Sequence, residues 1–408
     1  MAGPLDGVKI IDCTSVVLGP WAAQQLGDMG ADVIKVEPPR GDTTRQLGPT
    51  RNPDMAAFFL GCNRNKRSVV LDLKQESGRD ALFKLAESAD LLMHNYRPKP
   101  AARLGISYEA LKAVNPGLIY LATYGYRADG PLGDKAAYDD IIQAGSGLSM
   151  LQTVVAGEPR FLPSIVSDKT SSSAVVTAAL AALFERERSG LGQAVEVPMF
   201  ESMVSFVMVE HLYGESFVPS LGSTGYKRIL NKERRPYPSK DGYFALLPYT
   251  DRNWAEFCDL VGRTDILDDP RFQSLAARLE NIETVYATLA EICITRTNAQ
   301  WTELLRNSNV PHGPVNSLDD LLTDEQLAAT GFWEEAVHPT EGKLRMPGIP
   351  ARFSRTEPEI RMLQPNLGEH SVDVLKEAGI SDAAIQNMLD SGATTDGAQK
   401  SRGESPAR

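Results

Sequence analysis

The chain of 408 residues is 42% hydrophobic and 23% charged, and its 42 basic and 53 acidic residues give a net charge of -11. This length suggests about two domains, and the composition is that of a soluble globular protein. The acidic balance argues against nucleic acid or an anionic membrane as a partner, while a local basic pocket for phosphates remains compatible with it.

Cysteine and histidine usage gives no metal-binding pattern. The four cysteines form no CxxC pair, and the five histidines form no HxH or HExxH motif. We therefore expect no disulfide framework, no metal site and a reducing, cytoplasmic location. His94, within an apolar run, is interpreted as a buried core histidine. The amino terminus does not resemble a secretory signal, and no window reaches about 18 uncharged apolar residues, so no membrane span is expected.

The first 200 residues alternate short β-branched runs with helical patterns. Predicted strands cover residues 8–13, 31–37, 68–73, 89–96, 117–126 and 193–199. Predicted helices cover residues 20–30 and 76–88, and a further helix follows Asp168. Such alternation predicts right-handed βαβ units, and hence an α/β fold with a mostly parallel sheet and ligands at the carboxyl ends of its strands.

The second half of the chain changes in composition. A helix near residues 200–213 leads into a Gly/Ser/Pro-rich connector, and residues 225–320 predict a smaller α+β domain with one strand and three amphipathic helices. In the last of these helices, Trp301, Leu304 and Leu305 share one face. A helix and two strands joined by a Glu-Gly-Lys turn follow. From residue 391 the polar, Gly/Ser-rich sequence predicts a disordered tail.

The turn after the first strand lacks the fingerprint of a dinucleotide site. It reads SVVLGP, with Gly19 as its single glycine, whereas pyrophosphate binding needs GxGxxG at this point. P-loop and nucleophile-elbow motifs are absent as well. The sequence therefore gives no support to a nicotinamide-dependent dehydrogenase, an ATPase or a serine hydrolase.

Asp168 stands at the head of a Ser- and Ala-rich helix that spans residues 171–182. Small side chains allow close packing, so this helix is expected to be buried. At the helix start a carboxylate meets free N–H groups and the positive end of the macrodipole, which favour its ionised form. Asp168 is thus either an ordinary helix cap or a carboxylate nucleophile toward an activated acyl group.

Several motifs in one order resemble the class III CoA-transferases, the CaiB/BaiF family, over residues 4–353. They include PLDGVKIIDCTSVVLGPWAAQQLGDMGADVIKVEPPRGD, NRNKRSVVLDLK, ADLLMHNYRPKPAARLGISYEAL and AAYDDIIQAGSG. SDKTSSSAVVTAALAALFERERSGLGQAVEVPMFES and VPHGPVNSLDDLL follow. The number and order of these matches make the resemblance specific.

The resemblance implies a discontinuous, Rossmann-like CoA-binding domain formed by residues 1–200 and 321–390, a linker at 201–224 and a small α+β domain at 225–320. It also implies an interlocked homodimer. Asp168 falls at the position of the family's catalytic aspartate, which forms an aspartyl-acyl anhydride and then an aspartyl-CoA thioester. The expected substrates are an acyl-CoA and a small carboxylic acid, with no tightly bound cofactor and no metal.

The family's contacts with CoA can be carried over where this sequence matches. Arg103 would bind a phosphate, since a guanidinium offers several donors, although a solvated surface residue is its alternative. Tyr138 would lie near the thioester, with a half-buried aromatic as its alternative. The complete expected set is Val16, Leu71, Leu73, Asn95, Tyr96, Arg103, Leu104 and Tyr138.

The sequence departs from the family pattern at two places. Pro38 stands where many relatives have a basic residue for a CoA phosphate, and Arg40 or Lys66 would have to replace it. The glycine-run loop of the oxalate-type relatives is missing from LLPYTDRNW, and Ser15 and Val17 differ from their polar pair. The missing loop and the identities of Ser15 and Val17 both argue against formyl-CoA:oxalate specificity.

One detail of the transferase hypothesis and two alternatives to it remain open. Arg45, Arg51 or Arg64 could bind the second carboxylate of a dicarboxylate, although surface charge is the commoner role of such residues. An α-methylacyl-CoA racemase shares the fold, but its relatives place a histidine base at the position of Tyr138. A non-catalytic CoA-binding protein is disfavoured by the presence of Asp168.

Overall fold

The computed structural model describes residues 3–398, and its chain divides into two compact units. The first unit comprises Met1–Leu148, Phe161–Val207 and Ala328–Arg408. The second comprises Ser149–Arg160 and Met208–Leu327. Each unit therefore draws on chain segments that are distant in sequence.

The first unit contains a six-stranded sheet in which every neighbouring pair of strands is parallel. The strands are β1 (Lys9–Cys13), β2 (Asp32–Glu37), β3 (Lys66–Val70), β4 (Leu91–His94), β5 (Ile119–Tyr124) and β6 (Ala194–Pro198). Their order, β3-β2-β1-β4-β5-β6, is that of the doubly wound dinucleotide-binding folds. The predicted α/β fold with a mostly parallel sheet is confirmed.

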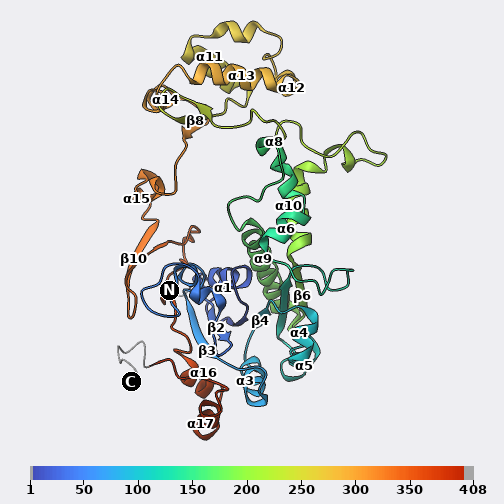
Figure 1. Ribbon diagram of the computed structural model, residues 1–408, viewed down its shortest axis with the longest axis vertical. Coiled ribbons are helices and arrows are strands. Elements are labelled where there is room, and N and C mark those ends of the chain that lie inside the picture. Colours follow the sequence, from blue (N-terminus) through green and yellow to red (C-terminus); the bar gives the residue numbers. More distant parts are fainter. Residues whose placement is uncertain (1–2, 399–408) are drawn as a thin grey trace. The chain divides into compact units, whose positions relative to one another are not determined.

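Helices cover both faces of this sheet. The apolar cluster on one face combines strand residues such as Ile11, Ile34 and Leu92 with α3 (Glu76–Ala86), α16 (Ser371–Glu377) and α17 (Asp382–Asp390). On the opposite side of the strands lie α1 (Leu18–Asp28) and α9 (Val166–Ser189), which pack against each other (Figure 1). Coverage of both faces explains why the central strands β1 and β4 are buried along nearly their whole length rather than alternating between buried and exposed residues.

Helix α9 is 24 residues long and begins two residues before Asp168. Its small side chains let it lie close to α1, and the hydroxyl of Ser172 donates to the main-chain oxygen of Leu18 at 2.6 Å. Val175, Val176 and Ala179 are buried on the same helix. The expected burial of this helix is therefore confirmed, and it brings Asp168 to the α1 side of the sheet.

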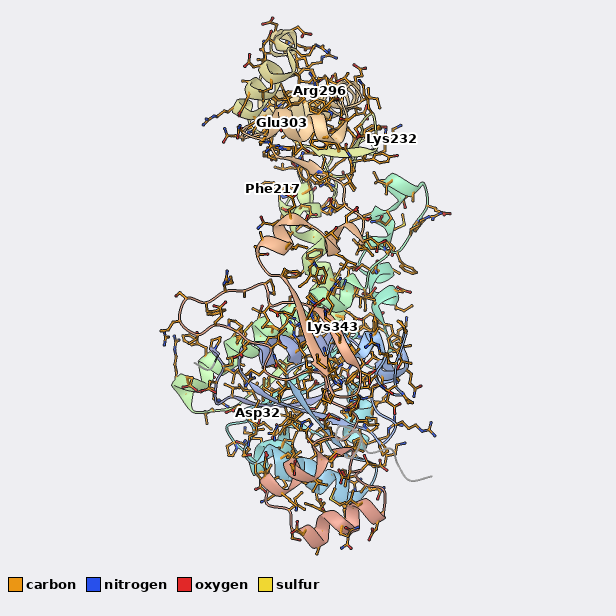
Figure 2. The ribbon with its side chains drawn as sticks, turned by 90° about the vertical axis from the view of Figure 1, so that its left-hand side faces the viewer. Asp32, Phe217, Lys232, Arg296, Glu303 and Lys343 are labelled. Atoms are coloured by element: carbon orange, nitrogen blue, oxygen red, sulfur yellow. The ribbon has the colours of Figure 1, made fainter. Side chains whose placement is uncertain are left out.

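The end of the described chain also belongs to the first unit. The hairpin of β10 (Trp333–His338) and β11 (Gly342–Pro347) carries an ion pair between Glu335 and Lys343 at 2.6 Å (Figure 2). The expectation of a disordered tail from residue 391 is wrong for residues 391–398. Ala393 is buried and accepts from the N–H of Asp72 at 2.8 Å, and the hydroxyl of Thr394 donates to the oxygen of Val70 at 2.7 Å. Residues 399–408 lie outside the described residues.

The second unit has a three-stranded antiparallel sheet, β7 (Tyr237–Pro238), β8 (Tyr243–Leu246) and β9 (His312–Pro314), beside α11 (Asp251–Val261), α13 (Ile282–Cys293) and α14 (Asn298–Leu305). Trp254, Phe257, Trp301 and Leu305 are buried in its core. The predicted apolar face of α14 is thus the face that packs inward. Thr250 and Thr297 close capping boxes at the starts of α11 and α14.

The remaining helices are mostly short. They are α2 (Ala57–Leu60), α4 (Pro98–Arg103), α5 (Tyr108–Val114), α6 (Asp139–Gly145), α7 (Leu148–Leu151), α8 (Thr153–Ala156), α10 (Met199–His211), α12 (Leu275–Glu280) and α15 (Glu325–Ala329).

Candidate active site

The strand order reverses between β1 and β4, and two candidate cavities lie at this edge of the sheet, one where β1, β4 and β5 end and the other mainly where β1, β2 and β3 end. In an open parallel sheet, the loops after such strands diverge and leave a crevice. One cavity, of about 260 Å³, contains Asp168 and is lined by residues at or just after the ends of β1, β4 and β5, among them Ser15, Asn95 and Tyr124. A second cavity of about 260 Å³ shares Ser15 and Tyr96 with the first. The geometry of the sheet therefore leaves two neighbouring cavities at this edge.

The loop after β1 is held in an uncommon conformation. Val16 has φ of +72°, a region that costs a β-branched residue strain. Its N–H donates to the Asp42 carboxylate at 3.3 Å. The side-chain amide of Asn95 accepts from the N–H of Ser15 at 3.1 Å and donates to its oxygen at 2.8 Å. The Asn95 side chain thus ties the β1 and β4 loops together.

Asp168 lies in the first turn of α9, but it does not cap the helix. The residue before the helix is Ile165, which makes no side-chain capping bond. The N–H groups of Ser167 and Asp168 donate instead to Oδ1 of Asp139, at 2.7 and 3.1 Å. The helix start therefore has a carboxylate cap supplied by α6.

The expectation that the helix start keeps Asp168 ionised is wrong. Burial, and then the negative charge of Asp139, raise the pKa of Asp168 to about 7. Asp139 already occupies the N–H groups that would have stabilised the anion. No hydrogen bond to the Asp168 carboxylate is present within residues 3–398. The result is a basic carboxylate that faces a cavity, which suits a nucleophile better than a structural cap.

The second cavity is largely apolar. Leu71 and Leu73, which follow β3, line it together with Tyr96 and Leu104. The same cavity includes Pro38 and the exposed Lys74 at its wall. No ion pair of Lys74 occurs in the described part of the chain. The leucines offer an apolar surface for a flat group, while the polar wall carries Asp72 beside Lys74.

Lys66 is not available as the cation that would replace a basic residue at Pro38. It is fully buried and bonds to Asp12 at 2.9 Å, to the oxygen of Pro20 at 2.8 Å and to Asn63 at 2.9 Å. Burial, with a contribution from the Lys35 charge, lowers the pKa of Lys66 to about 8. Arg40 is exposed, with no ion pair to a described residue.

The three arginines considered for a second substrate carboxylate are committed to the fold. Arg45 makes a buried pair with Glu37, with two contacts of 2.7 Å. Arg64 pairs with Asp28 at 2.8 Å. Arg51 donates to the main-chain oxygens of Glu341 and Lys343. Arg45 and Arg64 are therefore neither free surface charges nor available to bind a substrate, because each is paired with a buried carboxylate.

The other predicted residues fall into two groups. Val16, Asn95, Tyr96 and Tyr138 line the cavity of Asp168, with Tyr138 71% exposed at the start of α6. Arg103 is exposed in the last turn of α4 and lines neither cavity, although its neighbour Leu104 lines the second. His94 is buried and bonds to the hydroxyl of Tyr120 at 2.7 Å, and burial lowers its pKa to about 4. It is a core histidine, as predicted.

Sequence reasoning missed several residues of the Asp168 cavity. Arg97 follows β4 and donates to the main-chain oxygen of Asp134 at 2.6 Å. Thr123 and Tyr124 stand at the end of β5. The rule that ligands meet the carboxyl ends of adjacent parallel strands would have found all three, since each lies at a strand end next to the crevice.

The described chain offers neither a metal-binding cluster nor a membrane-spanning helix. Residues 3–398 contain no group of three or more His, Cys, Asp or Glu side chains placed to hold a metal ion. None of the helices in the same span is both long and apolar enough to cross a bilayer.

The chain belongs to CoA-transferase family III, whose family model matches residues 5–371. The resemblance seen in the sequence is thereby confirmed, and the protein is an enzyme of the CoA-transferase class.

Among its relatives is the succinyl-CoA:glutarate CoA-transferase of Mus musculus, 32% identical over 394 residues, which cover 95% of this chain and 90% of the relative. The acetyl-CoA:oxalate CoA-transferase of Acetobacter aceti is 32% identical over 391 residues, or 93% and 97% of the two chains. The crystal structure of a CaiB/BaiF family protein from Brucella suis matches with a TM-score of 0.77 at 30% identity, covering 93% of this chain and all of that one.

Proposed function

We propose that this CoA-transferase moves CoA from an acyl-CoA donor to a small carboxylic acid through covalent intermediates on Asp168. The observation that carries the proposal is the Asp168 carboxylate, which faces the crevice between β1 and β4 with a raised pKa and with its helix start capped by another residue. The second, more apolar cavity shares Ser15 and Tyr96 with the first, so one extended ligand could occupy both.

The first half of the proposed reaction needs no external base. An Oδ atom of ionised Asp168 attacks the thioester carbonyl carbon, the C–S bond breaks, and CoA leaves as a thiolate. The product is a mixed anhydride between Asp168 and the donor acyl group. The thiolate then attacks the Asp168 carbonyl carbon, the anhydride C–O bond breaks, and the donor acid leaves as a carboxylate.

The second half repeats these steps in reverse with the acceptor. Its carboxylate attacks the aspartyl-CoA thioester, which releases the thiolate and forms a new anhydride. The thiolate attacks the acceptor's acyl carbon, and the ionised Asp168 is regenerated. Protons need not be exchanged at any step, which agrees with the lack of a histidine among the residues that line the cavity.

For CoA itself, we propose that Leu71, Leu73 and Leu104 contact the adenine end. Lys74, at the wall of the same cavity, and the exposed Arg40 are the candidate phosphate ligands in place of a basic residue at Pro38. Arg103 stays a candidate for an outer phosphate, because its guanidinium has no ion pair within the described chain. Val16, Asn95, Tyr96 and Tyr138 would contact the pantetheine and thioester end.

The acid substrates are proposed to be small carboxylic acids, with dicarboxylates tested first. Relatives that cover most of this chain are named for glutarate, succinate and oxalate. A cavity of about 260 Å³ at Asp168 is of a size that suits a short acid. A homodimer is part of the proposal as well.

The test combines a substrate screen with trapping of the intermediate. Succinyl-, acetyl-, butyrobetainyl- and formyl-CoA are offered with a panel of mono- and dicarboxylic acids. Stalled reactions are digested and searched by mass spectrometry for CoA attached to Asp168. We expect transfer and an adduct in the wild type, and neither in Asp168→Asn. Transfer without an adduct, or racemisation of a 2-methylacyl-CoA without transfer, would contradict the proposal.

A further inference from the structure

Two side chains of α6 bind the segment that leads into α9. Oδ1 of Asp139 accepts from the N–H groups of Ser167 and Asp168. Gln143 accepts from the N–H of Leu162 at 2.9 Å and donates to the oxygen of Ser164 at 3.2 Å. Four main-chain groups between residues 162 and 168 are thus held by one pair of side chains.

The pair is itself locked together. Nε2 of Gln143 donates to Oδ2 of Asp139 at 2.6 Å, a short bond to a charged acceptor. The two residues are four positions apart on α6, so their side chains project from the same face of the helix. Both are buried, with Gln143 fully inaccessible. A buried pair with this many specific partners fixes the local backbone in one arrangement.

No other side chain among the described residues caps the start of α9, where the N–H of Val166 donates to the main-chain oxygen of Ser164 at 2.8 Å. Ile165 offers no side-chain acceptor, and the hydroxyls of Ser167 and Ser171 are buried without a hydrogen-bond partner. Asp139 therefore supplies the acceptor that the helix sequence lacks, from a position 29 residues earlier in the chain. The direction in which Asp168 leaves the backbone depends on this bond.

We propose that Asp139 and Gln143 are positioning residues of the transfer reaction: they fix the first turn of α9 and keep a negative charge beside the reactive carboxylate. This inference rests on the proposed role of Asp168 as nucleophile. It accounts for the Asp and Gln of the AAYDDIIQAGSG motif, to which the reaction scheme itself assigns no function.

The charge has a chemical consequence. Ionised Asp168 lies near a second carboxylate, so like-charge repulsion raises the energy of the free anion. When Asp168 is acylated or carries CoA, its negative charge is gone and the repulsion is relieved. Both covalent intermediates are therefore favoured relative to the free enzyme, and the more basic carboxylate is also the better nucleophile.

Other ionisable groups surround Asp168, and they do not cancel this effect. Arg97, Tyr96, Tyr124 and Tyr138 line the same cavity, yet the pKa of Asp168 is raised by burial and by Asp139, with no opposing contribution from a cation. Lys169, next in the helix, bonds to the hydroxyl of Ser164 at 2.7 Å. Cys62 is near enough for the Asp168 charge to contribute to its raised pKa, and it stays a neutral thiol.

Two variants separate position from charge. Asp139→Asn removes the charge and, because its amide NH₂ opposes that of Gln143, also breaks one bond of the pair. Gln143→Met keeps the charge and removes the bonds to Leu162 and Ser164. Asp140→Asn, the exposed neighbour in the same turn of α6, is the matched control for loss of one negative charge.

We expect kcat to fall about 10- to 100-fold in both variants, with KM for acyl-CoA within about threefold, because a displaced nucleophile affects the chemical step more than binding. In Asp139→Asn, the acid limb of the kcat profile moves to lower pH by about one unit. In Gln143→Met it stays near its wild-type position. Asp140→Asn leaves both quantities unchanged.

Thermal melting and CoA binding, measured for each variant, show whether a loss of activity is a loss of folding. A folded Asp139→Asn variant with the kcat and pH profile of the wild type would contradict the proposed effect of the Asp139 charge. A folded Gln143→Met variant with the kcat of the wild type would contradict the proposed positioning of the first turn of α9. If one variant does not fold, the other decides. Failure of the nucleophile proposal is recognised separately, since the wild type would then carry no adduct on Asp168.

Discussion

Asp168 combines two properties that a structural residue would not need. Its carboxylate is partly buried, and the nearest helix N–H groups are already bound to Asp139. Both conditions oppose ionisation, which the nucleophile requires. Such a side chain is destabilising in the free protein, and functional sites are where destabilisation of this kind is tolerated.

The variant Asp168→Asn is expected to be more stable than the wild type at pH 8 and nearly equal to it at pH 4. The folded-state pKa of Asp168 is raised to about 7 from an ordinary value of 3.8, so the folded chain binds the proton more tightly than the unfolded chain. Its contribution to stability is therefore lost as the pH rises from about 4 through 7. Allowing for partial exposure, we expect a gain of about 1 to 2 kcal/mol at pH 8.

Melting temperatures of the two proteins across this pH range provide the measurement. The difference between them should grow with pH and level off above about 8, one unit beyond the raised pKa. Ser173→Ala, at an exposed position five residues further along α9, serves as the control. A difference that does not change with pH would contradict the raised pKa.

Replacement by methionine is expected to affect stability at Lys66 and acyl-CoA binding at Lys74. Lys66→Met leaves the Asp12 carboxylate buried without its ammonium partner, so the free energy of unfolding should fall by roughly 3 kcal/mol or more. Lys74→Met should leave stability unchanged and raise KM for acyl-CoA about fivefold, the effect of one exposed cation on a phosphate. Urea unfolding and steady-state kinetics test the two expectations.

Raised salt gives a further check on Lys74. Its contribution to binding should weaken as ionic strength increases, since both charges are exposed to solvent. Equal KM values for wild type and Lys74→Met at low salt would exclude the lysine as a phosphate ligand and leave Arg40 as the candidate.

Sequence predicted the site unevenly, and the reason lies in partners distant along the chain. Asp168 was found through an ordered set of motifs, but the direction of its pKa shift was predicted wrongly. The shift comes from burial and then from the charge of Asp139, 29 residues away, and neither is visible in the local sequence. Arg64 and Lys66 each look like free cations in the sequence. Their buried partners, Asp28 and Asp12, become visible only when the sheet is assembled.

At the scale of elements, the parallel sheet was predictable because most of its strands are short runs of apolar residues that alternate with helical patterns. Right-handed crossovers alone do not give the order β3-β2-β1-β4-β5-β6. After β3 the chain returns across β1 and adds β4 on its other side, and no local sequence pattern specifies this return. Residues 391–398 show the opposite case. Their composition is that of a tail, yet the Thr394 hydroxyl donates to the oxygen of Val70 and the oxygen of Ala393 accepts from the N–H of Asp72, which fixes the segment at the end of β3.

Two truncations test whether this C-terminal segment stabilises the sheet. Removal of residues 392–408 takes away the buried Ala393 and the Thr394 hydroxyl, and leaves the N–H of Asp72 without its acceptor. We expect the melting temperature to fall by about 4 °C or more, corresponding to at least one or two lost bonds. Removal of residues 399–408 alone, the matched control, should change it little.

Because Leu71 and Leu73 flank Asp72, the longer truncation should also weaken acyl-CoA binding. Equal melting temperatures for the two truncated proteins would contradict a stabilising role for residues 391–398.

At the scale of the whole molecule, large apolar side chains are exposed along a short stretch of the second unit. Val209 and Val218 are 82% and 98% exposed, and Phe217 (Figure 2) and Leu221 follow the same pattern. Leu212 and Tyr213 are exposed as well. Single exposed apolar residues are common, but six within residues 209–221 indicate a surface that another chain covers. This observation supports the proposed homodimer.

The dimer is expected to have twice the mass of the 44.5 kDa chain in light scattering coupled to gel filtration. If its two chains thread through each other, they cannot separate without partial unfolding. Mixing of two differently tagged dimers should then give no mixed species over many hours, whereas refolding the mixture from denaturant should give them at the statistical share. A simple side-by-side dimer would exchange subunits in the native state, and its weaker contact would dissociate on dilution.

The double variant Val218→Ser with Leu221→Ser tests whether the exposed apolar stretch forms the dimer contact, and Val337→Ser, at an exposed position of the first unit, is its control. The double variant should lower the yield of refolded dimer, because the exposed apolar stretch must find the second chain before the threaded arrangement can close.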